Sequence, residues 1–198
     1  VIDEQHRFGV AQRAALTAKG VSPHLLVMSA TPIPRTLQLS LSGVRDLSVI
    51  ATPPVDRLAV KTYVMPFDPV VVKEAILREH FRGGQAFIVV PRISDMAEVY
   101  EALHTLLPDL KIVQAHGQMA ASQLDEIMTD FTEGKYDVLL ATSIIESGLD
   151  IPNANTIIVE NADRLGLAQL YQIRGRVGRA DKQAYAYITY KRDKMINE

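Results

Sequence analysis

The 198-residue sequence contains no cysteine, no apolar run of membrane-spanning length and no secretory signal sequence. Without cysteine it forms neither disulfides nor thiolate metal sites, a composition that fits a protein of the reducing cytoplasm. It also has no phosphate loop of the pattern G-x-x-x-x-G-K-[ST]. With 47% hydrophobic residues and a net charge of −2, the composition is that of a globular protein without a general coat of basic charge. Residues 174–194 are the exception, because they hold seven Lys or Arg against two acids.

Short apolar segments alternate with amphipathic ones, which predicts a parallel α/β fold. Residues 86–90 (AFIVV) are continuously apolar, as in a strand covered on both faces, and 138–141 is a further strand. Helices are expected at 69–82, 95–107 and 166–173. A fourth helix is indicated by Leu124, Ile127, Met128 and Phe131, whose spacing places them on one helical face.

The expected elements divide the chain into two unequal parts. Residues 1–50 supply too few strands to close a core, whereas 58–198 supply a full sheet with helices on both sides. The double proline Pro53-Pro54 favours extended chain, so we expect a linker at 51–57. The chain opens on an apolar pair that runs straight into acids, as if the start of a strand were missing. We therefore expect a piece of a longer protein.

Two chemically distinctive blocks lie in the first part, each after an expected strand, where ligands of parallel sheets bind. Asp3 and Glu4 can hold Mg²⁺ through water and orient an attacking water, although a pair of acids is also common in solvated loops. Ser29-Ala30-Thr31 continues to Arg35 in the string SATPIPRT. Its hydroxyls either cap a helix or relay between a nucleotide site and bound nucleic acid.

The second part has two further blocks at strand ends. His116-Gly117 follows a strand, and we expect the loop to contact a phosphate through its backbone. Thr142 begins TSIIESGLD, whose hydroxyl and backbone N–H groups can hold a nucleic-acid phosphate. Gly148 lies in this turn, and Asp150 can accept from a ribose hydroxyl or pair with an arginine. The alternative is a turn with a capping aspartate.

The most informative stretch is QLYQIRGRVGR at 169–179. Gln172, Arg176 and Arg179 recur at four- and three-residue spacing, and from this spacing we expect them to face one cleft. A guanidinium presents a planar fork of donors that suits phosphate oxygens. Gly175 and Gly178 each precede an arginine and leave room for a phosphate or another backbone. Taken alone, the segment also fits a solvated basic helix end.

In this order, the blocks resemble the later motifs of superfamily-two helicases and translocases. The resemblance implies a RecA-like parallel sheet sandwiched by helices, preceded by the C-terminal remnant of another RecA-like lobe, with ATP and Mg²⁺ as cofactors. It implies catalytic roles for Asp3, Glu4, Gln172, Arg176 and Arg179, and metal binding by the first two. It implies ATP binding by Gly148, Asp150, Gln172, Arg176 and Arg179. Coupling and DNA binding would fall to Ser29, Ala30, Thr31, Arg35, His116, Gly117 and Thr142.

Within that superfamily, SATPIPRT, AHGQM and QLYQIRGRVGR resemble one branch, which holds the transcription-repair coupling factors and the fork-regressing, branch-migrating DNA helicases. The string LSGVRDLSVIATPPVDRLAVKT (41–62) favours the coupling factors. That resemblance implies a cytoplasmic motor on double-stranded DNA. RNA polymerase and an excision-repair damage-recognition protein would bind through domains outside this chain. A fork helicase and a non-catalytic nucleic-acid-binding module remain alternatives.

Overall fold

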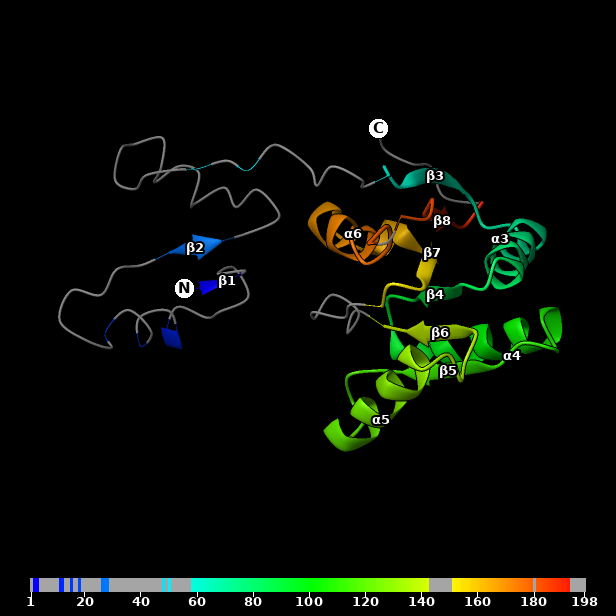
Figure 1. Ribbon diagram of the computed structural model, residues 1–198, viewed down its shortest axis with the longest axis horizontal. Helices are drawn as coiled ribbons and strands as arrows, with labels where there is room; N and C mark the ends of the chain where they lie inside the picture. The colour runs from blue at the N-terminus through cyan, green and yellow to red at the C-terminus, as the bar shows by residue number, and fades with distance from the viewer. Residues whose placement is uncertain are drawn as a thin grey trace. The chain divides into compact units, whose positions relative to one another are not determined.

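The computed structural model (Figure 1) describes residues 58–142, 151–179 and 181–192, together with residues 2, 3, 11, 12, 15, 18, 26–28, 48 and 50. The chain divides into two compact units, Val1–Thr52 and Pro53–Glu198. The expected linker at 51–57 lies outside the described residues, and its role as a joint between two motor lobes stays a prediction.

The first unit contains a pair of short parallel strands, β1 (Ile2–Asp3) and β2 (Val27–Met28). Ile2 is paired with Val27, and Asp3 is paired with Met28. Both strands therefore end at the same edge, and Asp3 stands at the carboxyl end of β1. The sequence places Ser29 directly after the last residue of β2.

The second unit is built on a six-stranded sheet with the strand order β3-β8-β7-β4-β6-β5. Every neighbouring pair of strands in it is parallel. The strands are β3 (Lys61–Pro66), β4 (Gln85–Val89), β5 (Ile112–Ala115), β6 (Val138–Ala141), β7 (Ala154–Val159) and β8 (Tyr185–Tyr190). The predicted parallel α/β fold is confirmed.

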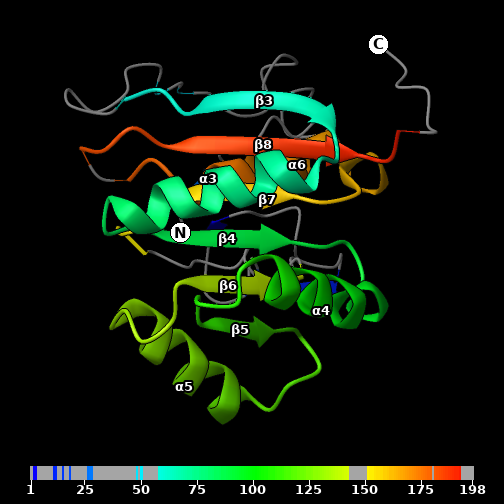
Figure 2. The ribbon, with the colours of Figure 1, turned by 90° about the vertical axis from the view of Figure 1, so that its right-hand side faces the viewer.

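Within the described residues, four α-helices and two short 3-10 helices connect these strands. The α-helices are α3 (Pro69–Phe81), α4 (Met96–Leu106), α5 (Ala121–Thr132) and α6 (Leu167–Arg174), and the 3-10 helices are η2 (Ile93–Asp95) and η4 (Ala162–Arg164). Figure 2 shows α3 and α4 lying across one face of the sheet. Helices α5 and α6 bury Phe131 and Ile173 in the core of the opposite face.

The central strand β4 explains why helices cover both faces. Its side chains alternate between the two cores: Ala86 and Ile88 pack with α3 and α4, whereas Phe87 and Val89 pack with α5 and α6. All four are at most 1% exposed. Successive side chains of a strand point to opposite faces of the sheet. Because all four of these side chains are apolar, each face of β4 needs an apolar layer to cover it.

Candidate functional site

The carboxyl ends of β5 and β6 bring two predicted site residues together. His116 follows β5 and Thr142 follows β6, and the two strands are neighbours in the sheet. The backbone N–H of Thr142 donates to the carbonyl oxygen of Ala115 at 3.4 Å. Thr142 is buried, His116 is half-buried and Gly117 is exposed. This sheet edge therefore carries the half-buried His116 and the exposed Gly117 next to the buried Thr142.

The start of α5 adds backbone donors to this edge. A tight turn, closed by the N–H of Met119 on the carbonyl oxygen of His116 at 3.1 Å, leads into the helix. The capping residue is Ala120, whose side chain cannot accept from the first turn, and no acid lies in that turn. Helix N-termini carry uncompensated N–H groups and a partial positive charge, so this end of α5 is suited to an anion. The buried Nδ1 of His116 has no hydrogen-bond partner within the described part of the chain.

A cluster of charged residues stands at the carboxyl end of β7, and sequence reasoning missed it. Glu160 follows β7, and burial together with the carboxylates of Glu98 and Asp95 raises its pKa to about 7, while Lys191 acts in the opposite direction. Asp95 also accepts from the guanidinium of Arg164 at 3.5 Å. The only sequence signal for this cluster was an acid directly after an apolar strand. The carboxylates that repel it, Glu98 and Asp95, lie far away in sequence.

Asn161, the residue after Glu160, turns the chain from β7 toward α6. It adopts a left-handed conformation with φ of 49° and ψ of 43° and is the only described non-glycine residue with positive φ. Asparagine tolerates this conformation better than most residues. Its carbonyl oxygen accepts from the N–H of Arg164 at 3.0 Å, which begins η4. A left-handed turn at Asn161 thus precedes η4 and the helix that carries Gln172.

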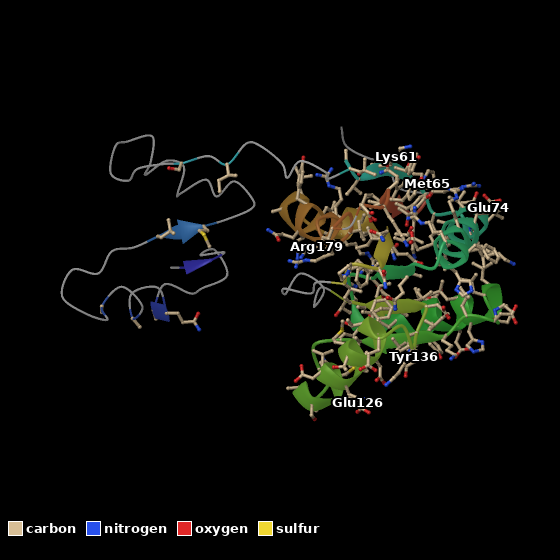
Figure 3. All side chains as sticks on the ribbon, viewed as in Figure 1. Lys61, Met65, Glu74, Glu126, Tyr136 and Arg179 are labelled. Atoms are coloured by element: carbon tan, nitrogen blue, oxygen red, sulfur yellow. The ribbon has the colours of Figure 1, made fainter. Side chains whose placement is uncertain are left out.

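The helix expected at 166–173 is α6, and the two arginines of the site follow it. Helix α6 ends at Arg174 and is capped by Gly175, so Arg176 and Arg179 lie beyond the helix. Arg176 is buried, at 9% exposure, whereas Arg179 is exposed and its Nε donates to the carbonyl oxygen of Gly175 at 3.3 Å (Figure 3). The sequence spacing therefore does not describe one helical face, and the shared cleft stays a prediction.

The two glycines of this segment have specific local roles. Gly175 ends α6, while Gly178 has φ of +76°. A Cβ on Gly178 would lie 2.8 Å from Cγ2 of Val60, a distance that such atoms do not tolerate. The space beside Gly178 is thus occupied by a side chain of this protein. The expected approach of a phosphate or another backbone at this glycine stays a prediction.

Several predicted site residues lie outside the described residues: Glu4, Ser29, Ala30, Thr31, Arg35, Gly148 and Asp150. Asp3 is described by its backbone alone. Within the described ranges, no three His, Cys, Asp or Glu side chains gather in a position to hold one metal ion. The described helices also include none with the length and apolar character needed to cross a bilayer.

A parallel sheet between two helical layers, with polar residues following its strands along one edge, is a doubly wound α/β architecture, to which RecA-like helicase lobes belong. The sequence profile of the Helicase conserved C-terminal domain matches residues 70–181, which is more than half of the chain. The chain belongs to this helicase C-terminal domain family.

Curated relatives match nearly the whole chain. It is 55% identical to the transcription-repair-coupling factor of Rickettsia typhi over 99% of its length. It is 50% identical to those of Bacillus subtilis over 100% and of Escherichia coli over 95% of its length. The match spans 18%, 17% and 16% of these relatives, respectively. This chain thus corresponds to less than a fifth of each relative.

Two solved structures extend the comparison. A structure of RecG bound to a three-way DNA junction is 44% identical, with a TM-score of 0.75, over 98% of this chain and 26% of that one. Dbp5 of S. cerevisiae bound to RNA and ADP BeF3 is 21% identical, with a TM-score of 0.69, over 97% of this chain and 52% of that one. The second likeness concerns the fold alone.

Proposed function

We propose that the intact protein is an ATP-dependent translocase on double-stranded DNA that removes stalled RNA polymerase and couples transcription to nucleotide excision repair. In this proposal, residues 1–50 end a first RecA-like lobe, 51–57 form the linker and 58–198 form the second lobe. The observation that carries it is the 47–55% identity to transcription-repair-coupling factors over 95–100% of the chain. We further propose that the protein works in the cytoplasm.

The nucleotide would be held between groups from both parts of the chain. Asp3 and Glu4 are assigned to Mg²⁺, through water, and to the attacking water. The position of Asp3 at the carboxyl end of β1 supports this, because acids at parallel strand ends are presented along one sheet edge. Mg²⁺ would neutralise phosphate charge there. Gly148 and Asp150 are assigned to nucleotide binding, on the motif resemblance alone.

The arginine segment would supply positive charge to the transferred phosphoryl group. Gln172, Arg176 and Arg179 are assigned to this side of the site, with Arg179 nearest the γ-phosphate. Charge develops on the phosphoryl oxygens in the transition state, and a prepositioned guanidinium stabilises it. The exposure of Arg179 supports its assignment, because its guanidinium can meet a group from outside the lobe.

The DNA backbone would lie along the carboxyl edge of the sheet. His116, Gly117 and Thr142 are assigned to DNA phosphates, and the uncapped start of α5 supports an anion at this place. Ser29, Ala30, Thr31 and Arg35 are assigned to coupling between the nucleotide and the DNA. Phosphate contacts of this kind fix position on the duplex without reading its sequence, as a translocase requires.

The test is the substitution Arg179→Ala in the full-length motor. We expect DNA-stimulated ATP turnover to fall by roughly 10³- to 10⁵-fold, the range for arginine fingers, with nucleotide affinity changed little. Arg179→Lys should recover little, because an ammonium lacks the planar fork. Arg78→Ala, at an exposed arginine of α3, is the matched control and should leave turnover near that of the wild type.

Turnover should be measured against DNA concentration at two salt levels. If Arg179 only binds the DNA backbone, the variant will bind DNA more weakly, and near-normal turnover will return at saturating DNA. That recovery would contradict the assignment.

A second candidate function is that of a fork-regressing helicase, which the 44% identity to RecG favours. Displacement of a stalled RNA polymerase from DNA by the full-length protein distinguishes the two functions. Remodelling of branched DNA without any polymerase displacement would replace the first proposal by the second.

A further inference from the structure

The residues that lead into β3 are bound to the segment that follows the arginines. Leu58, Ala59 and Val60 directly precede β3. The Nε2 of Gln183 donates to the carbonyl oxygen of Ala59 at 2.7 Å and to that of Ala184 at 3.0 Å. The N–H of Lys61 donates to the carbonyl oxygen of Ala184 at 3.0 Å. One side chain thus joins two segments that are 124 residues apart in sequence.

Apolar packing also joins residues 58–60 to the arginine segment. Val60 packs against the core cluster that contains Val177 and Ala184, both of which are fully buried. Its Cγ2 fills the space beside Gly178, where a Cβ would lie only 2.8 Å away. Arg176 and Arg179 flank this packed stretch, and Figure 3 shows Arg179 in the same unit as Lys61.

We propose that Gln183 is a positioning residue for the arginine segment. The clasp, defined as Leu58–Val60 together with Val177, Gly178, Gln183 and Ala184, fixes the backbone next to Arg179. These contacts lie directly before β3, the first strand of the sheet in sequence. A misplacement of about 1 Å at a catalytic group can cost about 100-fold in rate, which sets the scale of the effect. The inference rests on the proposed role of Arg179 in ATP turnover.

The test removes the donor of Gln183 in the full-length motor while keeping the length of the side chain. Gln183→Met and Gln183→Glu both lack a donor toward the carbonyl oxygen of Ala59, whereas Gln183→Lys retains one. We expect the first two to lower kcat by roughly 10- to 100-fold with the KM for ATP within about threefold of wild type. Lysine should recover a large part of the loss. Lys182→Met, at the exposed neighbouring residue, is the control and should keep wild-type turnover.

A double-mutant cycle separates positioning from a general structural role. If Gln183 acts through Arg179, then Gln183→Met in the Arg179→Ala background should cost less than about twofold in turnover. Losses that multiply in the double variant, or a methionine variant with wild-type kcat, would overturn the proposal. If Arg179→Ala alone leaves turnover intact, the assignment of Arg179 fails separately. The same cycle with Arg176→Ala then decides the role of Gln183.

Discussion

Glu160, the half-buried acid that follows β7, should lower the stability of this chain as the pH rises toward neutral. Burial and the nearby Glu98 and Asp95 raise the pKa of Glu160 from 4.5 to about 7. The folded state therefore binds this proton more tightly than the unfolded state does. The carboxyl group costs no stability below about pH 4.5, and its cost grows as the pH rises toward 7. At about 1.4 kcal/mol per pH unit, the whole shift corresponds to about 3 kcal/mol.

Glu160→Gln removes the titrating proton and keeps the shape of the side chain. The variant should exceed the wild type in unfolding free energy by about 3 kcal/mol at pH 8, and by less than about 1 kcal/mol at pH 5. Urea denaturation followed by circular dichroism at both pH values measures the difference, with the slope m as a check on the unfolded state. Glu98→Gln should give a smaller gain at pH 8, because it removes one of the two repelling carboxylates.

Glu74→Gln, at an exposed acid of α3, is the control and should change stability by less than about 0.5 kcal/mol at either pH. A Glu160→Gln chain that is no more stable than the wild type at pH 8 would refute the reasoning. That result would mean that the carboxylate has a compensating partner, and that the structure holds it charged at no cost.

Two further predictions concern the core and the isolated chain. Phe131→Ala should lower the unfolding free energy, measured by urea denaturation, by about 3–5 kcal/mol, because Phe131 is 0% exposed and its ring lies 5.6 Å from that of Phe87. Phe81→Ala, at 81% exposure, is the matched control. Equal losses in the two variants would contradict the described core. The isolated 198-residue chain should show negligible ATP hydrolysis, since its sequence lacks a phosphate-loop lysine. Turnover well above buffer that Glu4→Gln abolishes would contradict this.

Local patterns predicted the elements of the second unit well. The strand expected at 138–141 is β6, and the helices expected at 69–82 and 95–107 are α3 and α4 to within one residue at each end. These elements have a clear apolar period or a strong start signal, as at α3, where Pro69 follows the capping Asp68. The strand order could not be predicted in this way. It depends on pairings such as β3 with β8, which join opposite ends of the unit.

The site was partly predictable for the same reason. His116 and Thr142 were expected at strand ends, and adjacent parallel strands bring them to one edge. Glu160 has an equally simple position, directly after β7, yet its pKa is raised first by burial and then by two carboxylates about 60 positions earlier. Such an environment arises only when β4 and β7 pair and bring the segments that follow them together.

In the arginine segment, the motif and the structure give different reasons for the glycine at position 178. Beside an arginine, a glycine suggests close approach by a phosphate or by another backbone, and this was the expectation at Gly178. The structure gives another reason for a glycine here. Its φ is +76°, and Val60 occupies the place where a Cβ would lie. Val60, which directly precedes β3, thus leaves no space for a side chain at Gly178, more than a hundred positions later in the sequence. The glycine's contribution to any catalysis is then to let the backbone between Arg176 and Arg179 pack against the core. Because Gln183 holds the neighbouring carbonyl oxygen of Ala59, the two contacts should act together, and loosening either one should displace the same pair of guanidinium groups.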